Sequence, residues 1–271
     1  VTRAFWPGYD AGIELHRLPT PGLPLEGWLR LGNGSGSALG NDNSDYALDA
    51  RLDAAFGRAL PRGEGDAFLG LRVGSGLHLE SAEDRLGISP TTPGGFAYYA
   101  PVTVSGPRSL AEAHLVLYAG PLKLTAEAAL AREGRSRDTD GKPDTPRVAQ
   151  APVTSKGAFV ELGWMIRGPR RKQGRWPVAS PLGTWDWGAL ELGGRVERLR
   201  LGTGAPDVDP GGATSASLAL RWWATSFAAL SASATFTSYD TPPITEPDRT
   251  SGWLGLFRAT VRLPDELTLR R

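Results

Sequence analysis

Apolar and polar residues alternate with a period of two along most of the chain, and the segment 183–201 shows the pattern most clearly. Three of its apolar residues fall on one face of an extended chain and three charged residues on the other, namely Leu190, Leu192 and Val196 against Glu191, Arg195 and Glu197. A helix would scatter both kinds over its whole surface. Strands of soluble sandwiches have about 5 to 6 residues, whereas strands that cross a bilayer need about 9 to 11. The length of this segment therefore favours a membrane β-barrel.

The same alternation predicts further strands at residues 11–17, 26–33, 46–56, 68–80, 109–119, 122–132, 156–167, 215–224, 228–239 and 251–263. The connections between these strands mostly alternate between tight turns and long polar loops. Residues 168–182 are the exception, a long connection where the alternation predicts a tight turn. This arrangement predicts an all-β fold, an antiparallel transmembrane β-barrel with about 11 to 12 strands, and one domain over residues 1–271. Bacterial single-chain barrels have even strand numbers, so either a strand lies near residues 1–8 or several strands lie outside this chain.

Two polar segments are candidates for a special role. Residues 81–107 are the longest plainly irregular stretch, and loops beyond about 12 to 15 residues are usually functional or disordered, so we expect a lid or a pore constriction there. Asp138, Asp140 and Asp144 are spaced like the carboxylates of a calcium loop. The distal Glu of an EF-hand is missing, and a solvated Asp-Gly turn is the competing interpretation.

Composition narrows the class of protein further. No run of about 18 apolar residues occurs in the 271 residues, which excludes a helical membrane protein. The formal net charge of +1 gives no case for nucleic-acid binding. The 35 Gly residues suit many turns, and the 9 Trp residues suit the aromatic girdles of a barrel.

Several short motifs, in order along nearly the whole chain, resemble the phosphate-selective porins of Gram-negative outer membranes. The motifs lie at residues 11–15, 31–34, 45–47, 50–52, 120–121, 126–127, 157–164, 187–201 and 220–222. The resemblance implies a barrel of sixteen strands, of which this chain is similar to the carboxyl-terminal two-thirds, with about five strands ahead of Val1. It also implies a homotrimer, a loop at 81–107 that folds into the pore, and anion selectivity from basic residues that line the lumen.

Alternation places nine basic residues on the polar face as candidates for an anion path, namely Arg30, Arg51, Arg72, Lys123, Arg167, Arg195, Arg221, Arg258 and Arg262. They either form an electrostatic funnel for anions or pair with carboxylates of neighbouring strands and brace the wall. Nearly as many acidic residues share that face, namely Glu14, Glu26, Asp49, Asp53, Glu112, Glu127, Glu161, Glu191 and Glu197. Arg51, between Asp49 and Asp53, is the strongest candidate for a structural role.

The histidines His16, His78 and His114 lie on different predicted strands without paired spacing, so we expect no metal site, no cofactor and no catalytic residues. The sequence therefore predicts a passive outer-membrane porin that passes small anionic or neutral solutes and is surrounded by outer-membrane lipid and lipopolysaccharide. The alternative is a barrel with a plugged lumen whose long loops bind a surface partner or polysaccharide.

Overall fold

The computed structural model describes residues 12–18, 23–34, 46–60, 67–89, 91, 97, 99–138, 147–168, 188–225, 228–244 and 246–261. These residues form eleven strands: β1 (Gly12–Arg17), β2 (Leu25–Gly32), β3 (Ala47–Leu60), β4 (Ala67–Leu86), β5 (Thr103–Ala119), β6 (Leu122–Arg137), β7 (Val148–Arg167), β8 (Ala189–Thr203), β9 (Gly211–Trp223), β10 (Ala228–Tyr239) and β11 (Ser251–Val261). Within the same ranges, no helix has the length and apolarity that crossing a bilayer requires.

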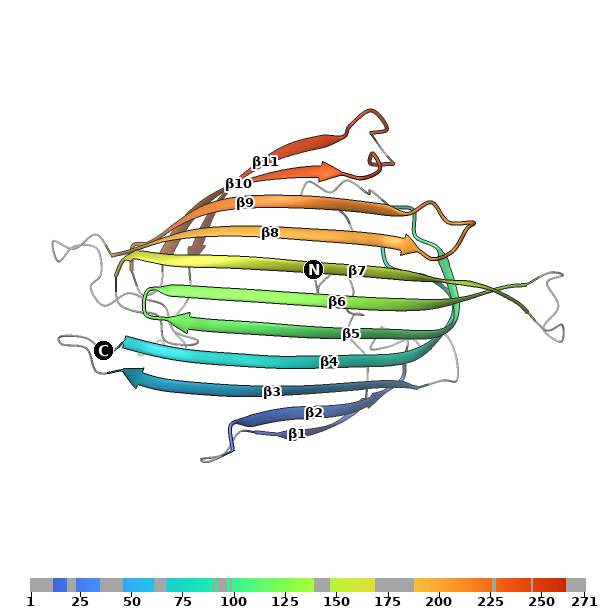
Figure 1. The fold of residues 1–271 in the computed structure, drawn as a ribbon, viewed down its shortest axis with the longest axis horizontal. Coiled ribbons are helices and arrows are strands. Elements are labelled where there is room, and N and C mark those ends of the chain that lie inside the picture. Colours follow the sequence, from blue (N-terminus) through green and yellow to red (C-terminus); the bar gives the residue numbers. More distant parts are fainter. Residues whose placement is uncertain are drawn as a thin grey trace, which may run out of the picture.

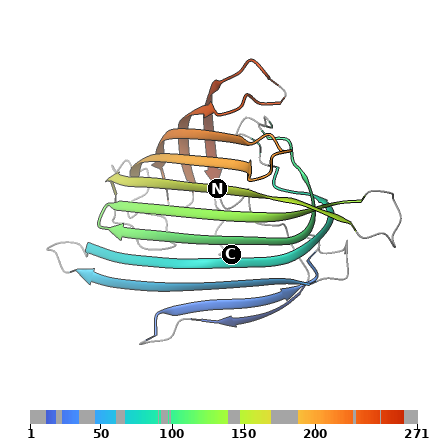
Figure 2. The ribbon, with the colours of Figure 1, turned by 45° about the vertical axis from the view of Figure 1, so that its right-hand side comes forward.

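The eleven strands form one antiparallel sheet in which every strand pairs with its neighbour along the chain (Figure 1). Among the described residues, β1 and β11 stand at the two edges and each pairs with a single strand. The sheet is curved, and β9 to β11 turn away behind β8 (Figure 2). The predicted all-β antiparallel fold is thus confirmed, with an open sheet of eleven strands.

Side chains of one parity line up in rows across the sheet, because the registers between strands are almost all regular. One row is polar and contains Thr125, Glu161, Arg195, Ser217 and Thr235. The adjacent row is apolar and contains Leu124, Leu162, Gly194, Leu218 and Ala234. We call the face with the polar row the inner face and the face with the apolar row the outer face.

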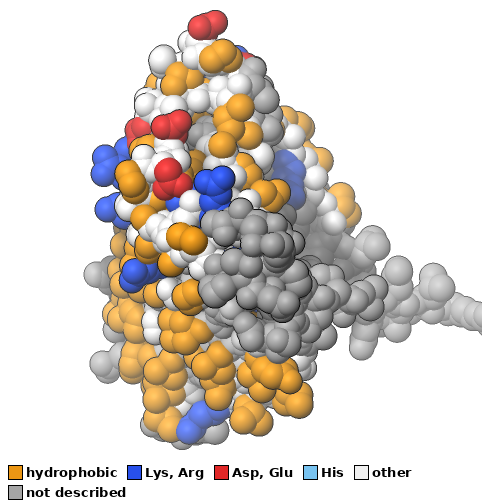
Figure 3. All heavy atoms as spheres, turned by 90° about the vertical axis from the view of Figure 1, so that its right-hand side faces the viewer, with side chains coloured by type: hydrophobic (Ala, Val, Ile, Leu, Met, Phe, Trp, Pro, Cys, Tyr) orange, Lys and Arg blue, Asp and Glu red, His pale blue; other side chains and the backbone are white. Residues whose placement is uncertain are grey.

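Large hydrophobic side chains stand exposed on the outer face. The exposed fractions are 50% for Leu162, 58% for Val196 and 60% for Leu218. On β7 the apolar outer positions run from Ala158 to Ile166, close to the 9 to 11 residues that a tilted strand needs to cross a bilayer. Figure 3 views the end of the sheet where the long loops lie, and hydrophobic side chains dominate the lower part of the described surface there. The outer face therefore resembles a surface made for lipid.

The strands reach further than the alternation predicts. Residues 81–86 belong to β4 and residues 103–107 to β5, so the expected irregular segment 81–107 is wrong at both ends. Likewise β6 continues to Arg137, and β7 begins at Val148 rather than at Lys156. Outside the apolar band neither face of a strand has to be hydrophobic, and the period-two signal disappears although the backbone ladder continues.

The described part of the connection between β4 and β5 folds onto the inner face. Ile88 and Tyr99 are buried there in one hydrophobic cluster with side chains of β5, β6, β8 and β9, namely Leu110, Ala129, Ala131, Leu201 and Ala213. The backbone N–H of Ile244 donates to the carbonyl of Ala97 at 2.9 Å, so the connection between β10 and β11 braces this segment. The described residues of this connection, 87–89, 91, 97 and 99–102, thus cover the inner face at its long-loop end, and we call them the covering segment. The role of 81–107 as a pore constriction stays a prediction.

The packing of Tyr99 against β8 requires a glycine at position 202. The φ of Gly202 is +68°, and a Cβ there would lie 2.5 Å from Cε2 of Tyr99. We expect Gly202→Ala to lower the free energy of unfolding by about 1 to 3 kcal/mol, because it adds backbone strain and displaces the Tyr99 ring. Gly255→Ala is the control, since nothing lies within 4 Å of its added Cβ. Urea unfolding followed by Trp fluorescence measures both variants, and an unchanged midpoint for Gly202→Ala would contradict the docked segment.

Candidate functional site

The inner face of β2, β3 and β4 carries a buried ion-pair cluster around Asp49. Its carboxylate accepts a hydrogen bond from Nη2 of Arg30 at 2.6 Å and lies 2.7 Å from Nδ1 of His78. The other ring nitrogen of His78 lies 3.5 Å from Glu80. Asp49, His78 and Glu80 are all buried, so each charge depends on its neighbours rather than on water.

Asp53, four residues beyond Asp49 on β3, is the centre of a second cluster. Its carboxylate accepts hydrogen bonds from Nε of Arg51 at 2.8 Å and Nε of Arg72 at 3.1 Å. Nε2 of His114, which is 61 positions away in the sequence, lies 2.6 Å from the same carboxylate. Gly74 makes this approach possible, because a Cβ there would lie 2.3 Å from Oδ1 of Asp53. Three strands, β3, β4 and β5, thus meet at one carboxylate.

A third cluster joins the strands to the covering segment. Arg108 lies 2.9 Å from Glu80 and 3.1 Å from Glu133, so it bridges two buried carboxylates. The backbone N–H of Ile88 reaches the carboxylate of Glu133 at 3.5 Å. Beside it, burial raises the pKa of the Tyr99 phenol to about 12, and the negative charge of Glu133 adds to the effect. The phenol therefore stays neutral throughout the physiological range.

The other half of the inner face, on β7 to β11, contains an open polar pocket of about 300 Å³. Its charged lining residues are Glu161, Glu191, Arg195, Arg221 and Arg258, and Ser217, Ser231 and Ser233 add hydroxyl groups. Gly193 leaves space in its floor because it has no side chain. Such a pocket can hold a small hydrated anion through guanidinium and hydroxyl groups.

The three arginines of this pocket differ in how they are paired. Arg195 lies 2.6 Å from Glu197 and 3.7 Å from Glu161, and its guanidinium stacks 3.8 Å from the centroid of the Phe159 ring. Arg221 lies over the ring of Trp223, at 5.3 Å from its centroid. Within the described part of the chain, neither Arg221 nor Arg258 has a carboxylate at salt-bridge distance, and both are exposed. These two arginines are the ones whose charge remains available to a solute.

The nine candidate basic residues separate into groups. Arg30, Arg51, Arg72 and Arg195 form ion pairs on the inner face, and Lys123, Arg221 and Arg258 share that face by register. Arg51 pairs with Asp53 but not with Asp49, whose partners are Arg30 and His78. Arg167 follows a register shift after Met165 and pairs with Leu190, and its expected place in the lumen stays a prediction. Arg262 lies outside the described residues.

Sequence reasoning missed His78, His114, Glu80, Arg108 and Glu133 as members of the ion-pair clusters on the inner face. His78 and His114 lack paired spacing in the sequence, yet each faces carboxylates of other strands. The alternation along each strand indicated which residues share a face. It could not indicate which of them are neighbours, because that depends on the register between strands. Among the described residues, no group of three His, Asp or Glu side chains is placed to hold a metal ion. Asp140 and Asp144 of the candidate calcium loop lie outside the described residues.

No protein family, curated protein or solved structure matches this chain. The resemblance to phosphate-selective porins therefore stays a prediction from the quoted motifs. The properties that bear on function are those of the sheet itself: an exposed apolar outer face, a charged inner face and a segment that covers one end of that inner face.

Proposed function

We propose that this chain forms the wall of a β-barrel channel in a Gram-negative outer membrane and passes small solutes through a water-filled lumen. The observation that carries the proposal is the two-sided sheet. Leu162, Val196 and Leu218 expose half or more of their surface on one face, whereas the other face holds charged side chains. An apolar face of this extent is unfavourable in water and favourable in lipid.

The alternation of loops supports the same proposal. The connections 120–121 and 224–227 are short and join strands at one end of the sheet, whereas 87–102, 204–210 and 240–250 are longer and join strands at the other. The connection 168–188 is the exception, because it is long but joins β7 and β8 at the short-turn end. Barrels of outer membranes have short periplasmic turns and longer extracellular loops. In a bilayer the edges of β1 and β11 must also be paired, because unpaired backbone groups are too costly in lipid, so further strands or another sheet complete the barrel. By resemblance, the assembly is a trimer of sixteen-stranded barrels.

Selectivity in this proposal comes from the polar pocket rather than from the ion-paired clusters. Arg30, Arg51 and Arg72 are neutralised by adjacent carboxylates and act as braces of the wall. Arg221 and Arg258 face the lumen without a carboxylate partner among the described residues, and they favour anions. The competing function is a plugged barrel, and the covering segment, with Ile88 and Tyr99 packed on the inner face, is the feature that favours it.

Replacing both Arg221 and Arg258 with Glu is expected to reduce the anion-to-cation permeability ratio several-fold. The pocket then changes from three arginines and two glutamates to one arginine and four glutamates. The zero-current potential in a planar bilayer under a salt gradient measures the ratio, first in chloride and then in phosphate.

Arg249→Glu is the control, because Arg249 lies in the connection between β10 and β11, where it pairs with Glu246. An unchanged ratio in the double variant would remove these arginines from the permeation path. Insertion of the protein without any conductance would instead favour the plugged barrel.

A further inference from the structure

A cluster of basic side chains lies on the outer face, where the apolar band ends and the long-loop side begins. Lys156 of β7 stands directly opposite Arg200 of β8, and Arg132 lies one row further toward the loops on β6. All three side chains are exposed. Basic side chains also project from the left edge of Figure 3, which corresponds to the front of Figure 1. We call Arg132, Lys156 and Arg200 the outer basic cluster.

The outer basic cluster has no internal counter-charge. Within the described ranges, none of its three members has a carboxylate at salt-bridge distance. The nearby Arg198 takes the carboxylate of Asp240 with two hydrogen bonds, one of them 2.7 Å long. Like charges placed directly opposite on neighbouring strands destabilise a sheet, with Cβ atoms about 4.5 to 5.5 Å apart. Lys156 and Arg200 therefore favour an anion that bridges them, in contrast to the paired charges of the inner face.

A groove lined by small residues lies next to this cluster, and Lys156 and Arg200 are part of its lining. It has a volume of about 530 Å³, and Ala111, Ala128 and Ala158 form its apolar part beside Lys156 and Arg200. On these strands the outer face is lower than its surroundings, because alanine side chains replace leucine and valine. The groove therefore connects a basic site that can bind an anion to the apolar surface of the outer face.

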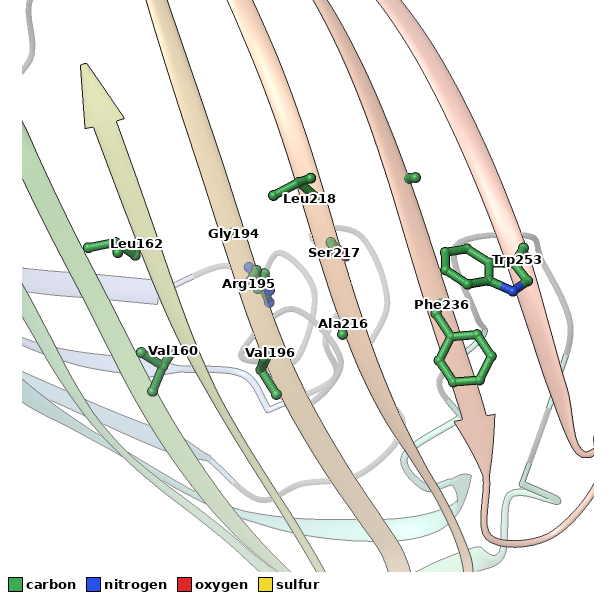
Figure 4. Close-up of a pocket in the computed structure, with 11 residues that line it drawn as sticks. Val160, Leu162, Gly194, Arg195, Val196, Ala216, Ser217, Leu218, Phe236 and Trp253 are labelled. Atoms are coloured by element: carbon green, nitrogen blue, oxygen red, sulfur yellow. The ribbon is translucent and has the colours of Figure 1, made fainter. Parts of the chain in front are cut away.

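A second, larger groove lies further along the strands in the direction of the short turns (Figure 4). Its volume is about 770 Å³, and its floor is low at Gly194 and Ala216, between Val160 and Leu162 on one side and Phe236 and Trp253 on the other. Val160 is four residues from Lys156, which is about 13 Å along a strand. A hydrocarbon chain that starts at the outer basic cluster can reach this groove.

We propose that the outer basic cluster and these grooves bind a lipid with a net anionic phosphate monoester headgroup in the leaflet next to the long loops. Lys156, Arg200 and Arg132 would hold the phosphate, and the alanine-lined groove with the groove at Gly194 would hold acyl chain. A headgroup phosphate supplies the missing counter-charge, and an acyl chain fills apolar surface that water would leave unfavourably wet. This inference rests on the proposed insertion of the sheet in a bilayer.

The test uses native mass spectrometry of the full chain refolded in detergent, with dioleoyl phosphatidic acid as the probe. Retained lipid adducts are expected for phosphatidic acid, and neither dioleoyl phosphatidylcholine nor inorganic phosphate should match them. The double variant Lys156→Gln and Arg200→Gln is expected to bind phosphatidic acid at least about tenfold more weakly, because two charge-assisted hydrogen-bond donors are lost. Ala158→Phe, which fills the groove without changing charge, should also reduce binding.

Lys123→Gln is the matched control, since Lys123 faces the inner side and should not affect lipid retention. Equal retention of phosphatidic acid by the double variant would overturn the inference, and so would equal retention of phosphatidylcholine or binding of inorganic phosphate alone. If several copies of the chain assembled without lipid through this surface, the lipid site would be refuted in favour of a contact between chains. Vesicle insertion of the same samples separates the two proposals: insertion without phosphatidic acid preference refutes only the lipid site, whereas failure of the unaltered chain to insert refutes the proposed function.

Discussion

Replacing Leu124 with Arg is expected to destabilise the membrane-inserted protein by about 2 to 4 kcal/mol, the cost of an arginine on the lipid face near the middle of a barrel wall. Leu124 lies in the outer row with Leu162 and Leu218, at the centre of the apolar band. An arginine there has to leave water for hydrocarbon or distort the bilayer around it. Urea unfolding from lipid vesicles, followed by Trp fluorescence, measures the change.

The adjacent substitution Thr125→Arg is the matched control, since it adds the same side chain one residue away on the same strand. Thr125 belongs to the inner row and lies directly opposite Glu161, so the new guanidinium gains a carboxylate partner. We expect little loss of stability from it. Equal losses in the two variants would show that the two faces have similar surroundings, which would contradict the insertion of this sheet in a bilayer.

Replacing Asp53 with Asn is expected to cost about 3 kcal/mol of stability, because it removes the carboxylate that two guanidinium groups and the ring of His114 share. Asp53 is 3% exposed and contacts Arg51, Arg72 and His114. Asparagine keeps the shape of the side chain, so the loss reports the charge and not a cavity. The same unfolding experiment in lipid vesicles measures it.

Asp207→Asn is the comparison for this second experiment. Asp207 also binds an arginine, with Nη1 of Arg135 at 2.9 Å, but its side chain is 48% exposed. Exposed ion pairs contribute little, and we expect only a small change in the unfolding midpoint. If Asp53→Asn were as mild as Asp207→Asn, the inner clusters would be ordinary surface charges rather than braces of the wall.

The position of each strand core was predictable from the sequence because the side-chain period of a strand is a local property. Glu161 and Leu162, like Thr125 and Leu124, separate to opposite faces as soon as the chain is extended. The ends of the strands were not predictable in this way. Beyond the apolar band of β4, residues 81–86 form a ladder with β5 although their polarity resembles that of a loop.

What the sequence by itself determined is therefore the all-β class, the approximate strand positions and the parity that places charged residues on one face. Only the tertiary structure decided which charges meet, because register depends on the lengths and turns of all the intervening strands. Asp53 and His114 are far apart in the chain, and neither residue's surroundings in the sequence indicate the other. The same reason applies to Lys156 and Arg200, whose opposition across β7 and β8 follows from backbone pairing and not from any local motif.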